Sequence, residues 1–293
     1  MGRLLRLITK DGAVMATVVD STDIVNRAEQ IHNTSAVVTA ALGRLLTAAS
    51  MMGNMLKGEN ESITLRLAGN GPAGQIVAVS DSSGNVRGYA SNSVVEIPLN
   101  EKGKLDVAGA VGRQGYLYVI KDLGLNEPYN GSIPLVSGEI AEDITAYYAI
   151  SEQIPTVCAL GVLVNPDLSI KAAGGFIVQL LPSADENTIS IIEKNISVIP
   201  AFTEMLSQGL TLEDIIKRVL ADFEIEVLAE KSVQYKCNCS QERVERALIS
   251  LGKEELSKIA RDKERIEVKC HFCDNKYYFN PEQISEFISK SLH

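Results

Sequence analysis

Cys237-Asn238-Cys239 and Cys270-His271-Phe272-Cys273 are the two stretches that decide how the end of this 293-residue chain folds. They hold four of the five cysteines and are separated by thirty residues. Each short pair presents two sulfurs on one turn of backbone, and two such pairs supply the four thiolates that a tetrahedral zinc site requires. The spacing therefore predicts one Zn²⁺ bound by Cys237, Cys239, Cys270 and Cys273.

Two other uses of these cysteines are a pair of constitutive disulfides and a redox centre of the thioredoxin type. Constitutive disulfides are rare in a reducing cytoplasm. A thioredoxin-type C-x-x-C opens a helix, whereas Arg265–Lys269 and Tyr277–Phe279 around the second pair have the pattern of two strands. Zinc is thus favoured, with His271 as an outer-shell residue. A thiol-disulfide oxidoreductase using Cys270 and Cys273 is the alternative.

The charge of the chain bears on its partners. The net charge is −9, yet residues 237–293 carry ten basic and ten acidic residues. All of the excess negative charge therefore lies in residues 1–236. An acidic upstream region and an evenly charged C-terminal part argue against binding to the phosphate backbone of a nucleic acid. No nucleic-acid partner is therefore expected, although a zinc-ribbon adaptor for nucleic acid is a third hypothesis.

The most apolar stretch runs from Thr34 to Leu56 and contains Arg44 and Asn54. Because polar groups interrupt it and small residues recur, we interpret it as a buried core helix and expect no membrane partner. The apolar run of residues 4–8 is too short for a signal peptide. The lack of an export signal, together with two cysteine pairs at metal-binding spacing, predicts a protein of the reducing cytoplasm.

Residues 1–182 are expected to form an α+β domain, because strands and helices follow one another without regular βαβ alternation. A hairpin is predicted over residues 3–19, with its turn at Lys10-Asp11-Gly12 and a helix start at Ser21. Alternating segments then predict strands, and one further helix is predicted over Glu139–Gln153. The strands are expected at Ile63–Ala68, Gln75–Ser80, Asn85–Ala90, Tyr116–Lys121, Ile133–Ser137, Thr156–Val164 and Ser169–Leu181.

Residues 183–232 differ in kind and are expected to form an amphipathic helical connector. Ser183-Ala184-Asp185-Glu186 resembles a capping box, Thr211 begins a later helix, and Phe223–Val227 alternates like an edge strand. Such short helices are not stable alone in water, so their apolar sides must rest on another part of the chain. Isoleucines recur at helical spacing, at positions 189, 192, 196 and 199. Residues 233–293 form the predicted small zinc-binding domain.

The remaining motifs have structural explanations. Gly69–Gly74 matches G-x-G-x-x-G, but a strand follows it, which indicates a hairpin turn rather than a nucleotide site. His32 is expected to be a local helix cap and Cys158 a buried structural thiol. Acidic residues at 139, 142 and 143 suit the first turn of a helix. No catalytic residue is predicted, and the chain is not expected to be an enzyme.

The C-x-C…C-x-x-C arrangement at the end of a chain of this size resembles the 33 kDa chaperonin family of redox-regulated heat-shock chaperones. Stretches along the whole chain support the resemblance. They are Ala41–Arg44, Gly71–Gly74, Ser137–Asp143, Ser151–Pro155 and Ala173–Phe176 with Gln179.

The resemblance implies an ATP-independent holdase that is inactive while reduced and zinc-bound. On oxidation, disulfides Cys237–Cys239 and Cys270–Cys273 form, zinc leaves, and the C-terminal region unfolds. The activated form, usually a homodimer, then binds unfolding client proteins. Physical reasoning agrees, since zinc contributes roughly 10–16 kcal/mol to such sites while a whole domain is stable by only about 5–15 kcal/mol.

Overall fold

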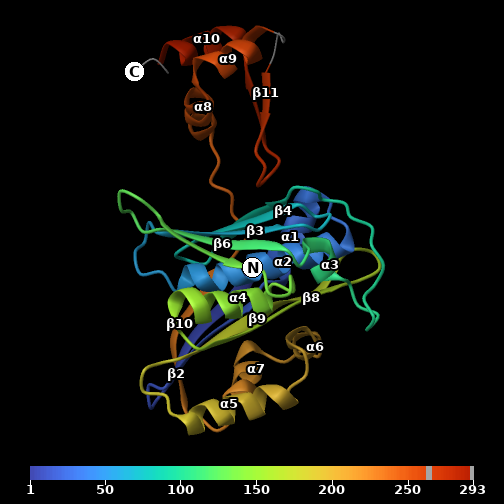
Figure 1. Cartoon of the computed structure of the whole chain (residues 1–293), viewed down its shortest axis with the longest axis vertical. Coiled ribbons are helices and arrows are strands. Elements are labelled where there is room, and N and C mark those ends of the chain that lie inside the picture. Colours follow the sequence, from blue (N-terminus) through green and yellow to red (C-terminus); the bar gives the residue numbers. More distant parts are fainter. Residues whose placement is uncertain (262–265, 291–293) are drawn as a thin grey trace. The chain divides into compact units, whose positions relative to one another are not determined.

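The computed structural model describes residues 1–261 and 266–290. Its contacts divide the chain into two compact units, Met1–Lys236 and Cys237–His293. Segment 183–232, the predicted connector, lies within the first unit. Helices and strands are mixed in both units, which confirms the α+β class (Figure 1).

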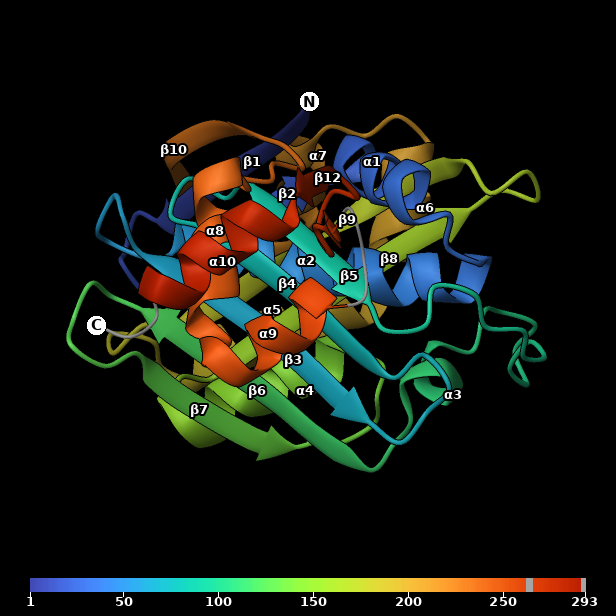
Figure 2. The same cartoon turned by 90° about the horizontal axis from the view of Figure 1, so that it is seen from above.

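Two antiparallel five-stranded sheets form the first unit. The first sheet has the order β10-β1-β2-β9-β8 and the second the order β5-β4-β3-β6-β7, whose strands lie side by side in Figure 2. The strands of the first sheet are β1 (Gly2–Thr9), β2 (Val14–Asp20), β8 (Thr156–Val164), β9 (Ile170–Leu180) and β10 (Ile225–Val233). Those of the second are β3 (Ser62–Gly69), β4 (Gln75–Asp81), β5 (Val86–Ala90), β6 (Gly115–Asp122) and β7 (Tyr129–Pro134).

Helix α2 (Ala36–Asn54) lies between the two sheets and forms the centre of the main core (Figure 1). It is long and apolar enough to cross a membrane, but 89% of its most apolar window is buried inside the protein. The core-helix interpretation is confirmed. Around it lie α1 (Thr22–His32), α3 (Val107–Val111) and α4 (Ala141–Tyr147), which continues as the π-helix η1 (Tyr148–Glu152).

Three helices of the connector cover the outer face of the first sheet: α5 (Glu186–Val198), α6 (Phe202–Ser207) and α7 (Leu212–Val219). Their buried side chains and those of the sheet form one apolar cluster. The sheet contributes Leu5, Leu7, Val18, Phe176 and Val178, and the helices contribute Ile192, Phe202, Met205, Leu212, Ile215 and Ile216. The expectation that these short helices rest on another part of the chain is thereby confirmed.

Strand β10 completes the docking of the connector. It pairs with β1 in antiparallel register from Gly2 opposite Val233 to Thr9 opposite Ile225, and it forms the edge of the sheet. The predicted edge strand at Phe223–Val227 is confirmed, although it begins later and runs further along the chain. Two ion pairs also link the connector to β1, since Arg3 contacts Glu213 of α7 and Glu230 of β10.

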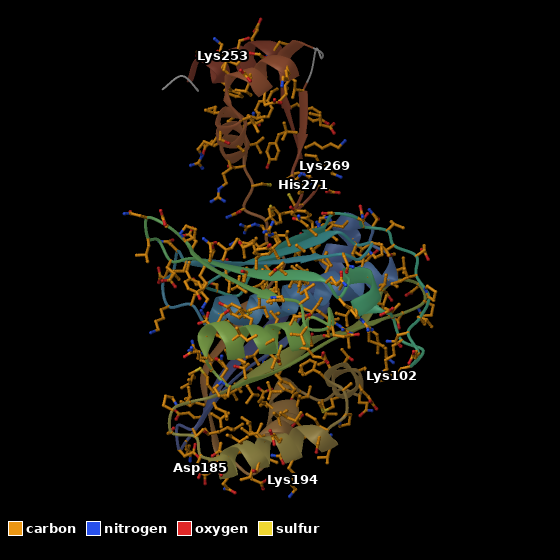
Figure 3. All side chains as sticks on the ribbon, viewed as in Figure 1. Lys102, Asp185, Lys194, Lys253, Lys269 and His271 are labelled. Carbon is orange, nitrogen blue, oxygen red and sulfur yellow. The ribbon has the colours of Figure 1, made fainter. Side chains whose placement is uncertain are left out.

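Local predictions were corrected at several element ends. The capping box at Ser183 is wrong: Asp185 caps α5, accepting a hydrogen bond from the Thr188 backbone N–H at 2.8 Å, and Ser183 Oγ donates to the Gly12 carbonyl instead. Figure 3 labels Asp185 at this helix start. The strand expected at Ile133–Ser137 is β7, which ends at Pro134.

The Gly69–Gly74 segment is the β3–β4 hairpin turn, as predicted. Gly74 has a φ of 67°, and a Cβ on Gly71 would lie 2.4 Å from the Ala110 carbonyl oxygen. Glycine is therefore required here by backbone conformation and close approach rather than by a nucleotide. The Asp11-Gly12 turn is also confirmed, with a φ of 70° at Gly12 between β1 and β2.

The second unit contains α8 (Gln241–Ser250), α9 (Gly252–Arg261), the hairpin β11 (Ile266–Lys269) with β12 (Lys276–Phe279), and α10 (Pro281–Lys290). Helix α9 was not predicted from the sequence. Among the described residues of this unit, six apolar side chains are buried in one cluster. They are Leu248, Leu256, Ile266, Phe279, Ile284 and Phe287.

Candidate metal centre

The first cysteine pair lies in the irregular segment between β10 and α8. Ser240 follows Cys239 directly and caps α8, its Oγ accepting a hydrogen bond from the Arg243 backbone N–H at 3.3 Å. A capped helix start fixes the direction of the chain as it leaves the pair. Cys237 and Cys239 are therefore held at one end of a helix.

The second pair lies on the turn that joins β11 to β12. The Cys270 N–H donates to the Asn275 carbonyl at 2.9 Å, and the Asp274 N–H donates to the Cys270 carbonyl at 2.9 Å. Asp274 adopts a φ of 62°, which closes the turn. An ion pair of 2.8 Å between Lys269 and Asp274 spans the same turn. The predicted hairpin knuckle for Cys270 and Cys273 is thus observed.

The four Sγ atoms converge on one point. All lie within 4.8 Å of one another, with Cys237 to Cys270 at 3.8 Å and Cys239 to Cys273 at 3.3 Å. A tetrahedral zinc ion with Zn–S bonds of about 2.3 Å places its sulfurs about 3.8 Å apart. The donor set and its spacing therefore fit a tetrahedral thiolate site, and these four cysteines could hold a metal ion.

Outer contacts to the sulfurs come from β12 and from the turn before it. Tyr277 donates its hydroxyl proton to Cys239 Sγ at 3.0 Å, and Asn275 Nδ2 lies 3.9 Å from the same sulfur. His271, for which an outer-shell role was expected, is exposed on the turn (Figure 3). Tyr277 was missed in the sequence, where only its alternation with Tyr278 along a strand could have indicated it.

These contacts make the thiols chemically unequal. Burial raises the pKa of Cys237 to about 11. Burial also acts upward on Cys239, but hydrogen bonds from Tyr277 and the neighbouring thiols outweigh it and lower its pKa to about 7. A lowered pKa favours the thiolate of Cys239, which is the reactive and metal-binding form of the side chain.

The family model described as Hsp33 protein matches residues 2–280 of this chain. The chain belongs to the Hsp33 family. Two similar relatives are both named 33 kDa chaperonin. That of Acetivibrio thermocellus is 50% identical over 285 residues, covering 97% of this chain and 96% of the relative, and that of Clostridium beijerinckii is 47% identical with 99% of each chain covered.

The fold agrees with an Hsp33 crystal structure. The 33 kDa chaperonin of Thermotoga maritima, a heat shock protein 33 homolog, aligns with a TM-score of 0.89 at 38% identity and covers 99% of this chain and 98% of its own. The resemblance drawn from the sequence is confirmed. The Hsp33 fold thus spans both the sheet unit and the four-cysteine unit.

Three residues of the first unit, directly before the cysteines, form a strap on β5 in this Hsp33 chain. The Val86 N–H donates to the Gln234 carbonyl at 3.0 Å, and the Lys236 N–H donates to the Val86 carbonyl at 2.7 Å. Between them, the Tyr235 hydroxyl donates to the Gly88 carbonyl at 2.8 Å. We call residues 234–236 the β5 strap.

His32 contributes to the same contact, which corrects its prediction as a local cap. Its Nε2 lies 2.9 Å from the Gly88 carbonyl oxygen and 3.2 Å from the Tyr235 hydroxyl. The local cap of α1 is Asn33, whose left-handed backbone lets its N–H donate to the Glu29 carbonyl. Sequence periodicity could not reveal this role because the partners of His32 are 56 and 203 residues away.

The other sequence candidates have structural roles in the Hsp33 fold. Asp143 is fully buried and accepts hydrogen bonds from the backbone N–H groups of Val136 at 2.8 Å and Ile140 at 3.0 Å. Glu139 pairs with Arg44 at 2.5 Å. Burial raises the pKa of Cys158, a free thiol on β8 packed against the main core.

Proposed function

We propose that this Hsp33-family chain is an ATP-independent holdase chaperone controlled by a zinc-thiol switch. In the resting state Cys237, Cys239, Cys270 and Cys273 hold one Zn²⁺ as thiolates. The observation that carries the proposal is the convergence of four sulfurs within 4.8 Å in a unit whose described core has only six enclosed side chains. Such a small core depends on its metal.

Oxidation activates the chain by converting each cysteine pair to a disulfide. Each pair, Cys237 with Cys239 and Cys270 with Cys273, loses two electrons and forms one S–S bond. One peroxide per pair accepts these electrons together with two protons and leaves as two water molecules. Disulfide sulfurs no longer supply thiolate charge, so the zinc ion dissociates and the small unit loses its support.

Undocking of the connector from the sheet is the second step of activation. Its helices are too short to persist alone, and they are held on the sheet mainly by the shared apolar cluster. When unit 237–293 melts, the β5 strap and β10 lose the folded segment that follows them. Undocking of 183–232 exposes apolar side chains on both the helices and the sheet, and such surfaces bind the apolar segments of unfolding client proteins.

This three-part division, 1–182, 183–232 and 233–293, is therefore proposed as a description of activation. The remaining parts of the proposal are a homodimer in the activated state, action in the cytoplasm and the absence of nucleic-acid, membrane or enzymatic roles.

The fold of the second cysteine pair disfavours the oxidoreductase alternative, since the C-x-x-C segment joins two strands and a thioredoxin-type pair opens a helix.

Aggregation and insulin-reduction assays separate the two functions. Peroxide with mild heat is expected to make the chain suppress aggregation of a denatured test protein, and dithiothreitol to restore inactivity. Insulin reduction should stay at the background rate. Efficient insulin reduction by the wild type, lost in Cys270→Ser, together with no suppression of aggregation, would establish the oxidoreductase instead.

Tyr235→Phe tests the β5 strap. The substitution removes the hydroxyl that donates to the Gly88 carbonyl and accepts from the Gly88 N–H at 3.2 Å. His32 Nε2 still contacts the Gly88 carbonyl at 2.9 Å, so the Gly88 N–H is the group that loses its partner, and leaving one buried donor unpaired costs about 1–3 kcal/mol. We expect unchanged zinc content in the reduced protein, faster proteolysis near β10, and activation at a lower peroxide dose.

Tyr116→Phe is the matched control, since Tyr116 lies on β6 and is 48% exposed. It should leave both the proteolysis rate and the peroxide dose unchanged. Equal behaviour of the two variants would show that the strap does not restrain the connector.

A further inference from the structure

A polar cavity of about 410 Å³ lies in the first unit, and none of the four clustered cysteines lines it. It is lined by β1, the loop after α2, the β4–β5 turn and β10. Its volume falls within the range of about 300–1,000 Å³ typical of small-molecule sites. Such sites are mostly apolar, whereas this lining includes Arg6, Lys57, Glu59, Ser82 and Lys231. Its ligand must therefore be polar.

The charges on the lining are predominantly positive. The lining contains three cations, Arg6, Lys57 and Lys231, and one carboxylate, Glu59. Two nearby carboxylates lie outside the lining and keep their charge: Asp81 Oδ1 accepts from the Ser83 N–H at 2.9 Å, and Glu61 Oε2 accepts from the Lys57 N–H at 3.0 Å. Among the lining residues themselves, three cations stand against one carboxylate.

Arg6 has one buried nitrogen without a hydrogen-bond partner in the part of the chain that the structure describes. Its Nε is buried and has no hydrogen-bond partner among the described residues, and Nη2 contacts only Met15 Sδ at 3.6 Å. A guanidinium carries five N–H donors in a fixed plane, and removing such a cation from water is costly unless an acceptor compensates. An acceptor bound in the cavity would supply the partner that Arg6 Nε lacks.

Strand register brings Arg6 and Lys231 to the same side of the sheet. Arg6 is opposite Ala229, and Lys231 lies two residues further along β10, so the two cations occupy diagonal positions of neighbouring strands. A register shift between Arg6 and Leu7 breaks the regular pairing at this point. Irregularities of this kind redirect side chains near functional sites. The positive charges of Arg6 and Lys231 repel each other, and an anion bound between them would offset this repulsion.

We propose that this cavity binds a small oxyanion of the phosphate class, with Arg6, Lys57 and Lys231 as its ligands. Planar guanidinium donors match phosphate oxygens, and lysines add point charges. The net charge of −9 disfavours a long polyanion, so the ligand is a free phosphate or diphosphate rather than nucleic acid. Because Ala229 and Lys231 form one wall, an occupied cavity holds β10 against β1.

Calorimetric titration with inorganic phosphate and with pyrophosphate, at constant ionic strength and in the reduced full-length chain, tests the site. We expect saturable binding, tighter for pyrophosphate because it carries more charge. Arg6→Gln and Lys231→Gln should each weaken it by about tenfold or more, as loss of a charge-assisted hydrogen bond does. Lys194→Gln is the control: Lys194 lies exposed on α5, outside the cavity (Figure 3).

Amide hydrogen exchange supplies a second readout that does not depend on chaperone activity. Pyrophosphate is expected to slow exchange across β10 in the wild type and in Lys194→Gln, but not in Lys231→Gln. Since Lys231 is exposed, that variant should fold normally. The absence of saturable binding, or binding that both cavity variants retain in full, would overturn the proposal.

Discussion

Cys270→Ser is expected to abolish tight zinc binding and to unfold residues 237–293 under fully reducing conditions. The hydroxyl cannot replace a thiolate, and three sulfurs then remain of the four that lie within 4.8 Å. Loss of a mere outer-shell partner weakens metal affinity by 10–100-fold, so loss of a ligand should weaken it by more than about 100-fold. Zinc content after gel filtration measures this directly.

The same variant should also loosen the connector. Limited proteolysis of reduced Cys270→Ser is expected to cut within 183–293, while the sheet unit remains resistant. Cys158→Ala is the matched control, since Cys158 lies on β8 outside the cluster and should keep both zinc and protease resistance. An intact 183–293 region in Cys270→Ser would contradict the dependence of the connector on the metal.

Phe202→Ala should separate connector docking from the metal. Phe202 is 4% exposed and packs on Phe176 of the sheet, with ring centroids 6.3 Å apart. Truncating a buried phenylalanine costs about 3–5 kcal/mol. This is large compared with the free energy that can hold three short helices on a sheet. We expect the variant to bind zinc normally and yet to suppress aggregation partially without any oxidant.

Val198→Ala serves as its control, because Val198 is 76% exposed at the end of α5. It should remain inactive until oxidised. If zinc-loaded Phe202→Ala is as inactive as the wild type, the apolar cluster under the connector is not the surface whose release produces activity.

The elements that could be predicted from the sequence are those whose signals are local. The C-x-C and C-x-x-C spacings, the Asp11-Gly12 turn and the apolar run of α2 each carry their meaning within a few residues. The strand signals around Cys270 likewise placed the second pair on a hairpin, which the structure shows as β11 and β12.

Features that depend on distant partners could not be predicted. Only the first residues of β10 alternate clearly, and the strand is completed by pairing with β1 more than two hundred residues away. His32 and Tyr235 meet for the same reason. At Ser183 the error was local: both Ser183 and Asp185 are good cap residues, and only the fold shows that Ser183 Oγ bonds to the Gly12 carbonyl.

Zinc content and aggregation suppression, measured together along a single peroxide titration at mild heat, test the central claim most directly. The account predicts that the two change in step: about one zinc ion per chain is released as suppression appears, and dithiothreitol with zinc reverses both. Zinc release that leaves suppression unchanged, or suppression that appears while the zinc remains bound, would contradict it.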